Sequence, residues 1–417
     1  MSAKNPKPKI AIFHCGFVYS GGGERIVLEE ALGLKKRGYQ VKVYAPTIDV
    51  KLCYPQLLKK LNVKMFLPSF IEWLPFRDAL RMAATSLLAP FLAINFRDSD
   101  IFLGANQPGA WIAFCMAKVL KKPYLVYLNQ PNRLIYPRKI DKQTGWQNRK
   151  DYYLLAKVIK LIHSFIRWAD RVSINSCQSL LVNGDYIGQI ITQIYGQDVV
   201  VCPGGVYPQK RLIKQNVFKG QFKIKNHLIV KPYILITNRH EPQKRFDYVL
   251  KALKKVLNKF PQVELVIPGP FTLYTLDLIA LARKLKINHK VKFIGQITEV
   301  DLQKLYSQAV VYCYPSPEED FGLGPLEAGA WGVPTVAWNH AGPGVTVKSN
   351  QTGYLAKPYE INDYADKILK LIDYPQQRAK MGLAAWNWTK NQFSWQRHIN
   401  ILEREIKQTI VSYLRRR

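Results

Sequence analysis

Short apolar runs and longer segments of helical spacing alternate along the first half of the chain. The runs are rich in Val, Ile and aromatic residues, which is typical of buried strands. They predict strands at 9–14, 40–45, 100–105, 123–128, 171–175 and 198–203. The segments between them predict helices at 24–37, 77–94, 108–120, 150–169 and 177–193. Strands and helices that alternate in this way indicate βαβ units, and therefore a parallel sheet.

The alternation restarts in the second half after a break at 206–232. That segment carries seven basic and no acidic side chains and has weak periodicity, so a domain boundary is expected there. Strands are predicted afterwards at 233–237, 263–269, 291–295, 310–316 and 334–338. The helix predicted at 246–260 carries one apolar stripe, formed by Val249, Leu250, Leu253, Val256 and Leu257.

These patterns predict an α/β protein with two Rossmann-like, doubly wound domains that face each other across a cleft. The length of 417 residues also favours two cores, because one domain usually has about 100–200 residues. The expected domains are 1–205 and 206–393, followed by a helix at 394–417. That helix is expected to pack back toward the N-terminal domain through the stripe Ile399, Leu402, Ile406, Ile410 and Leu414.

Composition changes this picture mainly through charge. Hydrophobic residues make up 48% of the chain and charged residues 22%, which excludes a disordered, collagen-like or coiled-coil protein. The net charge of +32 predicts attraction to a polyanion, such as nucleic acid, anionic lipid or a phosphorylated substrate. Solvation of a lysine-rich surface is the alternative explanation of the same charge.

The cysteines and the apolar runs bear on the compartment. Six scattered cysteines without a Cys-x-x-Cys motif predict buried free thiols in a reducing compartment, and no zinc site. The first residues lack the apolar core of a signal peptide. The apolar run at 87–94 contains Pro90 and is shorter than the roughly 18 residues of a membrane span. We therefore expect a cytoplasmic protein without a transmembrane helix.

The stretch PSPEEDFGLGPLEAGAWGVPTVAWNHAGPG at 315–344 carries the most chemical information. A strand is expected to end at Tyr314, a loop to hold Glu319, and a helix to begin near Pro325 with Glu327 in its first turns. Backbone amides at such a helix start suit a phosphate, and carboxylates suit sugar hydroxyls. Two glutamates eight positions apart could therefore contact opposite ends of a nucleotide-sugar. The alternative is a surface acid and a first-turn acid that stabilise the helix.

This stretch resembles the glutamate, seven residues, glutamate motif of retaining glycosyltransferases with the two-domain GT-B architecture, most closely family 4 (group 1). The resemblance extends over nearly the whole chain. It includes GGGERIVLEEALGLKKRGYQVKVYAP at 21–46, SINSCQSLL at 173–181, VVVCPGGV at 199–206, NRHEPQKRFDYVLKAL at 238–253, AGPGVTVKSNQTGYL at 341–355 and FSW at 393–395. It implies a retaining hexosyltransferase whose N-terminal domain binds the acceptor and whose C-terminal domain binds a nucleotide-sugar donor.

The resemblance also implies roles for individual residues. Arg239 and Lys244 would hold the donor's diphosphate and Glu319 the transferred sugar, so these three are the expected catalytic residues. An Arg and a Lys just after a strand supply the charge that stabilises a departing nucleoside diphosphate, although they could also be solvated surface cations. Glu327 would bind the ribose hydroxyls. The expected donor-binding set is Glu327, Phe321, Gly322, Leu323, Gly22, Gly23 and Gly269.

One position departs from the family. Similar lipid-linked mannosyltransferases read tyrosine, any residue, histidine, any residue, proline after the strand predicted at 123–128. Here Asn129 stands in place of that histidine. An amide can hydrogen-bond a sugar hydroxyl but cannot titrate near neutral pH. Asn129 is therefore expected to contact the sugar without shuttling a proton, and neither His240 nor His340 obviously replaces the missing imidazole.

No metal ion and no cofactor are expected besides the donor substrate. Asp98-Ser99-Asp100 spells the Asp-x-Asp that another glycosyltransferase architecture uses for a divalent cation. Asp100, however, opens a predicted strand, whereas ligands of such sheets bind at the carboxyl ends of strands. Arg239 and Lys244 could neutralise the leaving group without a cation.

Weaker features of the sequence predict the identity of the donor and of the acceptor. The stretch 339–344 is similar to the mannosyltransferase branch and favours GDP-mannose, with a UDP-sugar for glucosyl or N-acetylglucosaminyl transfer as the alternative. Residues 51–96 are amphipathic and basic, and residues 118–160 hold eleven basic and two acidic positions. Both favour a saccharide or phospholipid-linked acceptor and a peripheral position on the cytoplasmic face of an anionic membrane. A sugar-nucleotide epimerase and a nucleic-acid-binding protein are rival classes, but no nucleic-acid-binding motif supports the second.

Overall fold

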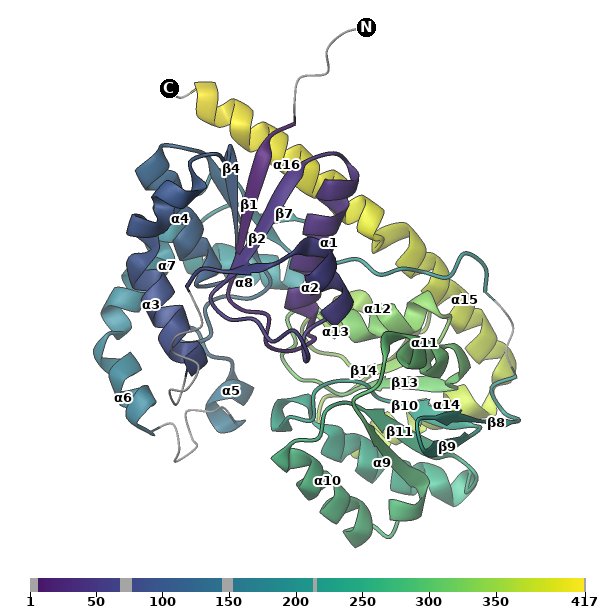
Figure 1. Ribbon diagram of the computed structural model, residues 1–417. Helices are drawn as coiled ribbons and strands as arrows, with labels where there is room; N and C mark the ends of the chain where they lie inside the picture. The colour runs from purple at the N-terminus through teal and green to yellow at the C-terminus, as the bar shows by residue number, and fades with distance from the viewer. Residues whose placement is uncertain (1–6, 68–76, 145–152, 213–215, 416–417) are drawn as a thin grey trace, which may run out of the picture. The chain divides into compact units, whose positions relative to one another are not determined.

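The computed structural model describes residues 7–67, 77–144, 153–212 and 216–415. The chain divides into two compact units. Unit 1 comprises Met1–Pro137, Arg149–Gly205 and Trp395–Arg417, and unit 2 comprises Arg138–Asn148 and Val206–Ser394. Each unit is an α/β layer structure with helices on both faces of its main sheet (Figure 1).

Unit 1 is built on a parallel seven-stranded sheet. Its order is β3-β2-β1-β4-β5-β6-β7, so β1 lies between β2 and β4 and the strand order reverses there. The strands are β1 (Lys9–His14), β2 (Gln40–Ala45), β3 (Lys64–Met65), β4 (Ile101–Ala105), β5 (Tyr124–Leu128), β6 (Leu180–Val182) and β7 (Val200–Val201). The strands β1, β4, β5 and β6 are almost entirely buried, because helices cover both faces.

Two hydrophobic cores lie on the two faces of this sheet. One core is formed with α1 (Gly22–Lys36), α2 (Pro55–Leu61) and α16 (Trp395–Arg415). The other is formed with α3 (Arg77–Leu92), the 3-10 helix η1 (Ala93–Phe96), α4 (Gly109–Leu120), α7 (His163–Asn175) and α8 (Asp185–Tyr195). A further helix of unit 1, α6 (Tyr153–Leu161), precedes α7.

The C-terminal helix α16 is an integral part of unit 1. Ile399 packs so closely on α1 that a Cβ added to Gly33 would come within 2.5 Å of its side chain. Arg37 at the end of α1 forms an ion pair with Glu403 at 2.5 Å. In the interior, His398 Nε2 lies 3.1 Å from the Glu30 carboxylate, and both side chains are fully buried. The helix therefore completes the core of a domain whose other residues come from the first half of the chain.

Unit 2 is built on a parallel six-stranded sheet of order β12-β11-β10-β13-β14-β15. The strands are β10 (Tyr233–Leu235), β11 (Glu264–Pro268), β12 (Val291–Gly295), β13 (Val311–Tyr314), β14 (Thr335–Trp338) and β15 (Gly353–Ala356). The order reverses between β10 and β13. A two-stranded antiparallel hairpin, β8 (Gln221–Ile224) and β9 (His227–Val230), precedes the sheet.

Helices also cover both faces of the unit 2 sheet. One core contains residues of α9 (Phe246–Lys259), α10 (Leu273–Lys284), α14 (Ile361–Asp373) and α15 (Pro375–Gln392). The other contains residues of the β8–β9 hairpin, α11 (Glu299–Gln308) and α12 (Leu323–Ala330). The short elements α5 (Lys139–Thr144), η4 (Pro242–Lys244), η5 (Asn288–Lys290) and α13 (Pro343–Thr346) connect the larger ones.

The two parallel sheets confirm the predicted α/β fold class, but two local predictions are wrong. Residues 171–175 were predicted as a strand and form the last turns of α7. Ala169, Asp170, Ser173 and Ile174 are buried there at helical spacing, which the short apolar alternation concealed. The predicted helix 177–193 begins instead with strand β6, followed by α8.

One larger-scale expectation also differs from the structure. Residues 138–144 are predicted in the N-terminal domain, but they belong to unit 2. The segment 206–232, where a domain boundary is predicted, contains the β8–β9 hairpin in its described part. Among the described residues, one helix, Arg77–Phe96, is also long and apolar enough to cross a membrane by length and composition, which the shorter run at 87–94 did not indicate.

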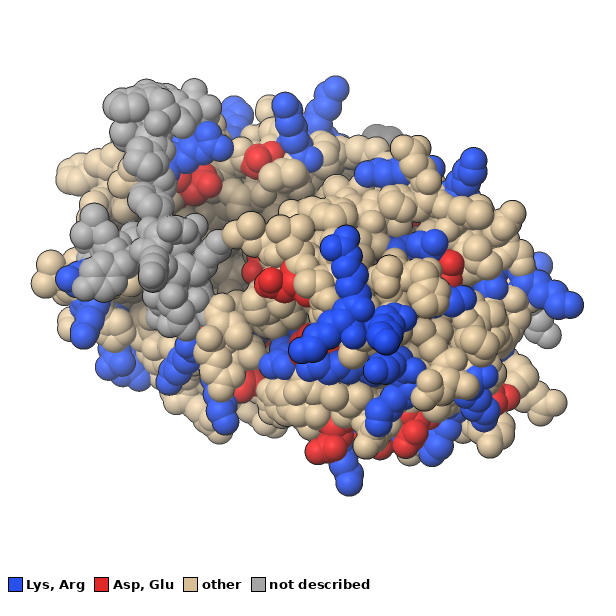
Figure 2. All heavy atoms as spheres, turned by 90° about the horizontal axis from the view of Figure 1, so that it is seen from below, with Lys and Arg blue, Asp and Glu red and all other residues tan. Residues whose placement is uncertain are grey.

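Basic side chains outweigh acidic ones on the face of the molecule shown in Figure 2. On the face in Figure 2, blue Lys and Arg cover far more area than red Asp and Glu. Part of the imbalance arises because several acids are buried, among them Glu29, Glu30 and Asp170. The exposed surface is thus strongly positive, in line with the net charge of +32.

Candidate functional site

The switch point of unit 2 brings most of the predicted donor residues together. The chain leaves β10 toward Arg239 and Lys244, and it leaves the adjacent β13 toward Glu319. Open parallel sheets bind ligands outside the carboxyl ends of strands where the strand order reverses. The topology therefore places the predicted catalytic residues at the edge where a ligand is expected.

Glu319 and Lys244 are in direct contact. Lys244 Nζ donates a hydrogen bond to Glu319 Oε2 at 2.5 Å, and the two side chains are 16% and 20% exposed. Burial alone would raise the pKa of Glu319. The charges of Lys244 and Arg138 and the hydrogen bonds from Lys244 and Tyr314 outweigh burial, so the pKa lies below its ordinary value. The carboxylate is therefore ionised at neutral pH and can only accept hydrogen bonds.

Arg138 supports this site from a distant part of the sequence. Its guanidinium donates to the Glu318 backbone carbonyl at 3.1 Å and pairs with both carboxylate oxygens of Asp141 at 2.9 Å. The Ile140 backbone N–H donates to Glu318 Oε2 at 3.1 Å. We call residues 315–322, between β13 and α12, the glutamate loop. The segment around α5 thus holds the backbone of this loop and adds a positive charge next to Glu319.

A second loop fixes the glutamate loop from the other side. The Gly342 N–H donates to the Glu319 carbonyl at 2.7 Å. A Cβ at Gly342 would come within 2.5 Å of the Phe321 backbone, so only glycine fits there. His340 Nδ1 accepts a hydrogen bond from the Glu318 N–H at 3.1 Å. His340 therefore has a positioning contact with the loop.

Phe321, Gly322 and Leu323 connect the loop to α12. Phe321 is 5% exposed and packs against Phe393 with ring centroids 5.9 Å apart. Gly322 caps the helix with φ +88°, a conformation that L side chains adopt only with strain. Leu323 begins α12 and packs against the same small core as Phe321. The buried phenyl ring anchors the loop, while the glycine sets the direction of the helix.

Glu327 lies one turn into α12 and belongs to a hydroxyl network. Tyr306 donates to Glu327 Oε2 at 3.0 Å. Thr237 Oγ1 lies 2.9 Å from the Tyr306 hydroxyl and 2.8 Å from the Tyr312 hydroxyl. Burial, followed by the nearby Tyr312 and Glu327, raises the pKa of Tyr306 well above its ordinary value, so the phenol remains a donor. The network fixes the orientation of a carboxylate that could accept hydroxyl donors.

Arg239 and Gly269 follow neighbouring strands of the same edge. Arg239 is half-buried after β10, and its backbone N–H donates a hydrogen bond to Asn238 Oδ1. Gly269 follows β11 with φ +141°, and a Cβ there would lie 2.7 Å from the Asn238 carbonyl. His240 is buried between them, with Nδ1 2.9 Å from Thr275 Oγ1, and burial lowers its pKa. The neutral His240 is therefore a packing residue of this edge.

The remaining predicted residues lie at the switch point of unit 1. Gly22 begins α1, and a Cβ at Gly23 would lie 3.5 Å from Asn129 Nδ2. Asn129 follows β5, and its backbone N–H donates to Asn106 Oδ1, which follows β4. Asn183, after β6, donates from Nδ2 to Asn129 Oδ1 at 3.2 Å. We call Asn106, Asn129 and Asn183 the asparagine cluster.

The asparagine cluster is buried yet incompletely bonded. Its members are 5–9% exposed. Asn129 Nδ2 and Asn183 Oδ1 have no hydrogen-bond partner among the described residues. Buried amides normally satisfy their donors and acceptors, so these two atoms are available to a ligand hydroxyl beside the glycines that begin α1.

Sequence reasoning missed Arg138, the Tyr306–Glu327 contact and two of the three asparagines. The signal for the asparagines was available, because each one directly follows a strand. No local pattern marks Arg138, since its role depends on a segment that folds with the other unit. Among the described residues, no group of three His, Cys, Asp or Glu side chains could hold a metal ion.

Comparison with known families decides the class of protein. The family Glycosyltransferase Family 4 matches residues 20–210, and Glycosyl transferases group 1 matches residues 219–388. The chain belongs to the group 1, family 4 glycosyltransferases. It is thus a retaining enzyme that transfers a sugar from a nucleotide-sugar donor, and the predicted family and enzyme class are confirmed.

Two curated relatives and two solved structures illustrate the range of this glycosyltransferase family. Human alpha-1,3/1,6-mannosyltransferase ALG2 is 24% identical over 97% of both chains. D-inositol 3-phosphate glycosyltransferase of Rhodococcus erythropolis is 28% identical over 56% of this chain and 54% of its own. Anabaena HepE in complex with UDP superposes with a TM-score of 0.71 at 16% identity, covering 96% of this chain and all of HepE. Sucrose-phosphate synthase from Thermosynechococcus elongatus gives a TM-score of 0.69 at 17% identity, covering 97% and 100%.

Proposed function

We propose that the chain transfers mannose from GDP-mannose to a phospholipid-linked saccharide on the cytoplasmic face of a membrane, in glycolipid or polysaccharide synthesis. The observation that carries the proposal is the similarity to a mannosyltransferase, human ALG2, along 97% of both chains. This sequence similarity includes the N-terminal half of the chain, whereas the sequence matches to a D-inositol 3-phosphate glycosyltransferase and a glycogen synthase cover 56% and 63% of it.

The site geometry supports specific roles for the residues of unit 2. Lys244 and Glu319 touch, so a phosphate bound by the first and a sugar bound by the second would be adjacent, as the sugar–phosphate bond requires. Arg239 and Lys244 would stabilise the negative charge of the departing GDP. Glu319 is ionised and would accept hydrogen bonds from sugar hydroxyls, and Glu327 from those of the ribose.

The proposed reaction breaks the bond between the anomeric carbon and the phosphate oxygen. The acceptor hydroxyl attacks from the same face, and its proton passes to the leaving phosphate, which becomes GDP. Glu319 is not the nucleophile, because a double displacement needs a carboxylate on the opposite face of the sugar. The two cations supply the charge neutralisation, so we expect unchanged turnover in the presence of a chelator.

A thermal-shift screen of nucleotide-sugars tests the donor. GDP-mannose and GDP should raise the melting temperature more than UDP-glucose, UDP-N-acetylglucosamine and UDP, because ligands that bind only the folded state stabilise it. Radiolabelled mannose should then appear in a lipid-extractable product with the anomeric configuration retained by NMR. A larger shift with a UDP-sugar would overturn GDP-mannose as the donor, while leaving the glycosyltransferase class intact.

A UDP-sugar enzyme that transfers glucose or N-acetylglucosamine is the second candidate. The observation in its favour is the 28% identity to a D-inositol 3-phosphate glycosyltransferase, which is higher than the 24% to ALG2 but covers only 56% of the chain. The same screen separates the two, since the nucleobase alone changes between GDP and UDP.

A further inference from the structure

One helix of unit 1 is apolar like a membrane span but mostly uncovered. Only 28% of the apolar window of Arg77–Phe96 is buried. Ala89, Ala93 and Phe96 face the unit 1 core. On the other side, Leu87 is 67% exposed and Phe91 78%. Because one side is fixed in the protein core, this helix can lie on a surface but cannot cross a bilayer without leaving its own domain.

The beginning of α7 presents a second apolar stripe. Leu161 at the end of α6 is 85% exposed, and Phe165 and Trp168 are about half exposed. These positions are four and three residues apart, so they share one side of a helical segment. Exposed Leu, Phe and Trp in a row are unusual for a soluble surface and are typical of an interaction site.

Trp111 of α4 joins the two stripes. Its indole N–H donates to the Ser86 carbonyl of α3 at 2.9 Å. Its ring centroid lies 5.8 Å from that of Trp168 and 6.4 Å from that of Phe165. Ser86 of α3 and two aromatic side chains of α7 thus meet at one indole. We call the exposed apolar residues of these helices the α3–α7 face: Leu87, Phe91, Ile94, Leu161, Phe165 and Trp168.

Most charged side chains next to this face are basic, although α3 begins with Arg77 and Asp78 and η1 is followed by Arg97 and Asp98. Every exposed charged residue on the described parts of α4, α6 and α7 is basic, namely Lys118, Lys157, Lys160, Arg167 and Arg171. The acid of these helices, Asp170, is 2% exposed and bonds to Tyr195. A partner that covers the apolar face would therefore meet cations around it.

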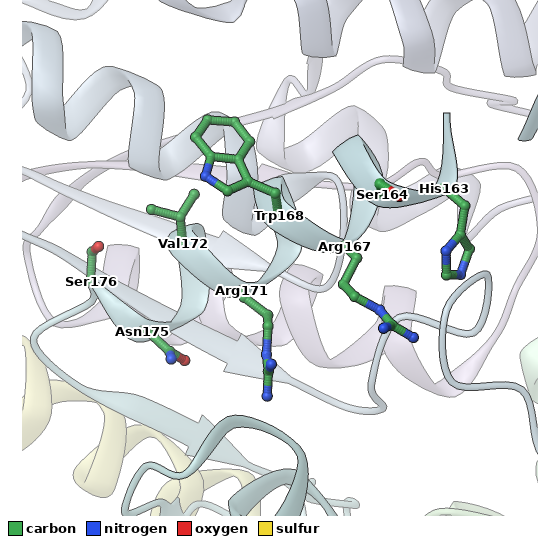
Figure 3. A pocket seen from close by; sticks show the side chains of 8 residues that line it. All are labelled: His163, Ser164, Arg167, Trp168, Arg171, Val172, Asn175 and Ser176. Atoms are coloured by element: carbon green, nitrogen blue, oxygen red, sulfur yellow. The ribbon is translucent and has the colours of Figure 1, made fainter. Parts of the chain in front are cut away.

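A hollow on α7 is lined by both basic and apolar side chains. It has a volume of about 460 Å³ and is lined by Arg167, Arg171, His163 and Trp168, among others. Figure 3 shows the two guanidinium groups extending from one side of α7, while Trp168 and Val172 extend from the other. Guanidinium pairs bind phosphate oxygens through several charge-assisted hydrogen bonds. The lining thus offers two guanidinium groups to a phosphate, with the apolar Trp168 and Val172 on the other side of the same helix.

We propose that the α3–α7 face docks unit 1 onto an anionic lipid bilayer, with a lipid phosphate between Arg167 and Arg171. The aromatic and aliphatic side chains would enter the boundary of headgroups and acyl chains, and the cations would meet the anionic headgroups. This inference deepens the proposed lipid-linked acceptor by naming the surface that brings the enzyme to it. Charge complementarity selects an anionic membrane as the occupant.

Vesicle flotation of the full chain tests the apolar part. The protein should float with vesicles of phosphatidylcholine and phosphatidylglycerol, and much less with phosphatidylcholine alone. The double variant Leu87→Ser, Phe91→Ser should lower binding by about tenfold or more, because each large apolar side chain contributes more than 1 kcal/mol at the interface. The matched control Leu273→Ser, Leu276→Ser removes two equally exposed leucines from α10 of unit 2 and should float like the parent.

Charge reversal tests the basic part. Lys160→Glu with Arg167→Glu should reduce binding to anionic vesicles by about tenfold or more and leave binding to neutral vesicles unchanged, since each basic residue contributes about 1 kcal/mol near an anionic surface. Lys254→Glu with Lys255→Glu changes the net charge equally on exposed positions of α9 and should have little effect. Equal losses in the two double variants would reduce the effect to net charge and overturn the site.

Further measurements distinguish a lipid bilayer from other occupants of this face, and test the inference separately from the proposed function. Release of the protein from vesicles by inorganic phosphate at constant ionic strength would assign the hollow to free phosphate and overturn the lipid. A change in sedimentation of Leu87→Ser, Phe91→Ser without a change in flotation would assign the face to a second copy of the chain. Failure of the parent to float would overturn the inference even if GDP-mannose is the donor. Flotation without any GDP-mannose response would instead sink only the proposed donor.

Discussion

The switch points of the two units have the same backbone plan and opposite chemistry. In each, a strand at the reversal of strand order leads into a loop and a helix: β1 toward α1 in unit 1, and β13 toward α12 in unit 2. Unit 2 gathers Lys244, Glu319 and Arg138 within one charged cluster. Unit 1 gathers Asn106, Asn129 and Asn183, which are neutral.

The difference teaches that the sheet determines where a ligand binds and the side chains determine which chemistry occurs there. A departing diphosphate needs fixed cations, and the unit 2 site supplies them together with the carboxylate that they keep ionised. Recognition of hydroxyl groups needs donors and acceptors without net charge, which amides supply. We therefore propose that this retaining glycosyltransferase stabilises the charge of the leaving group in unit 2 and recognises hydroxyl groups in unit 1.

The largest expected effect comes from removing the carboxylate of the charged cluster. Glu319→Ala should lower kcat by about 10³-fold or more, as expected for a partly buried group that is proposed to contact the reacting sugar. Transfer of radiolabelled sugar measures this, with circular dichroism to confirm the fold. Glu360→Ala removes an exposed carboxylate of the same unit and should be fully active. Normal turnover by Glu319→Ala would remove this residue from the active site.

Loss of the paired cation should have the next largest effect. Lys244→Met should lower kcat by about 10²-fold, because one charge on the leaving group is lost. Lys251→Met, which removes a surface pairing with Asp247, is the control. If both variants behave alike, Lys244 has no special role.

The loss of stability in Lys244→Met should depend on pH. The lowered pKa of Glu319 contributes stability that is complete above the ordinary value of 4.5 and is lost as the pH falls through the folded-state pKa. The difference in free energy of unfolding between the parent and Lys244→Met should therefore be largest at neutral pH and shrink in acid. Urea unfolding at several pH values measures it, and a constant difference would contradict the ion pair.

Substitution in the asparagine cluster should lower activity less than substitution in the charged cluster. Asn183→Ala leaves the side-chain oxygen Oδ1 of Asn129 without its donor, which should cost about 1–3 kcal/mol of stability. The variant should also raise KM more than it lowers kcat. Asn288→Ala, at an exposed position of unit 2, is the control. A fall in kcat as large as that of Lys244→Met would break the proposed division of labour between the units.

The smallest effect concerns a single backbone conformation. Gly322→Ala and Gly196→Ala both place a side chain at positive φ, +88° and +70°, so each should cost about 1 kcal/mol of stability. Gly196 ends α8 with open space around it. Only Gly322→Ala should also weaken the thermal shift produced by the donor, and equal responses would separate Gly322 from the donor site.

Sequence periodicity predicted most strands because their apolar runs are buried on both faces, as at 9–14 and 263–269. It failed at 171–175, where a short alternation fits a strand and a half-buried helix equally well. Motif reasoning found Glu319 and Lys244, which are in contact in the structure. It could not find Arg138, because its partner Glu318 lies 180 residues away and no local pattern encodes such a contact.

The C-terminal helix has a consequence for synthesis of the chain. Unit 1 lacks α16 until residues 395–415 have been translated, although its sheet is complete at residue 201. At about 5–20 residues per second, the ribosome needs roughly 10–40 seconds to translate the intervening segment. During that interval the apolar surface that will receive Trp395, Ile399 and Leu402 has no covering helix. The nascent first unit is therefore expected to be a chaperone client until unit 2 has been made.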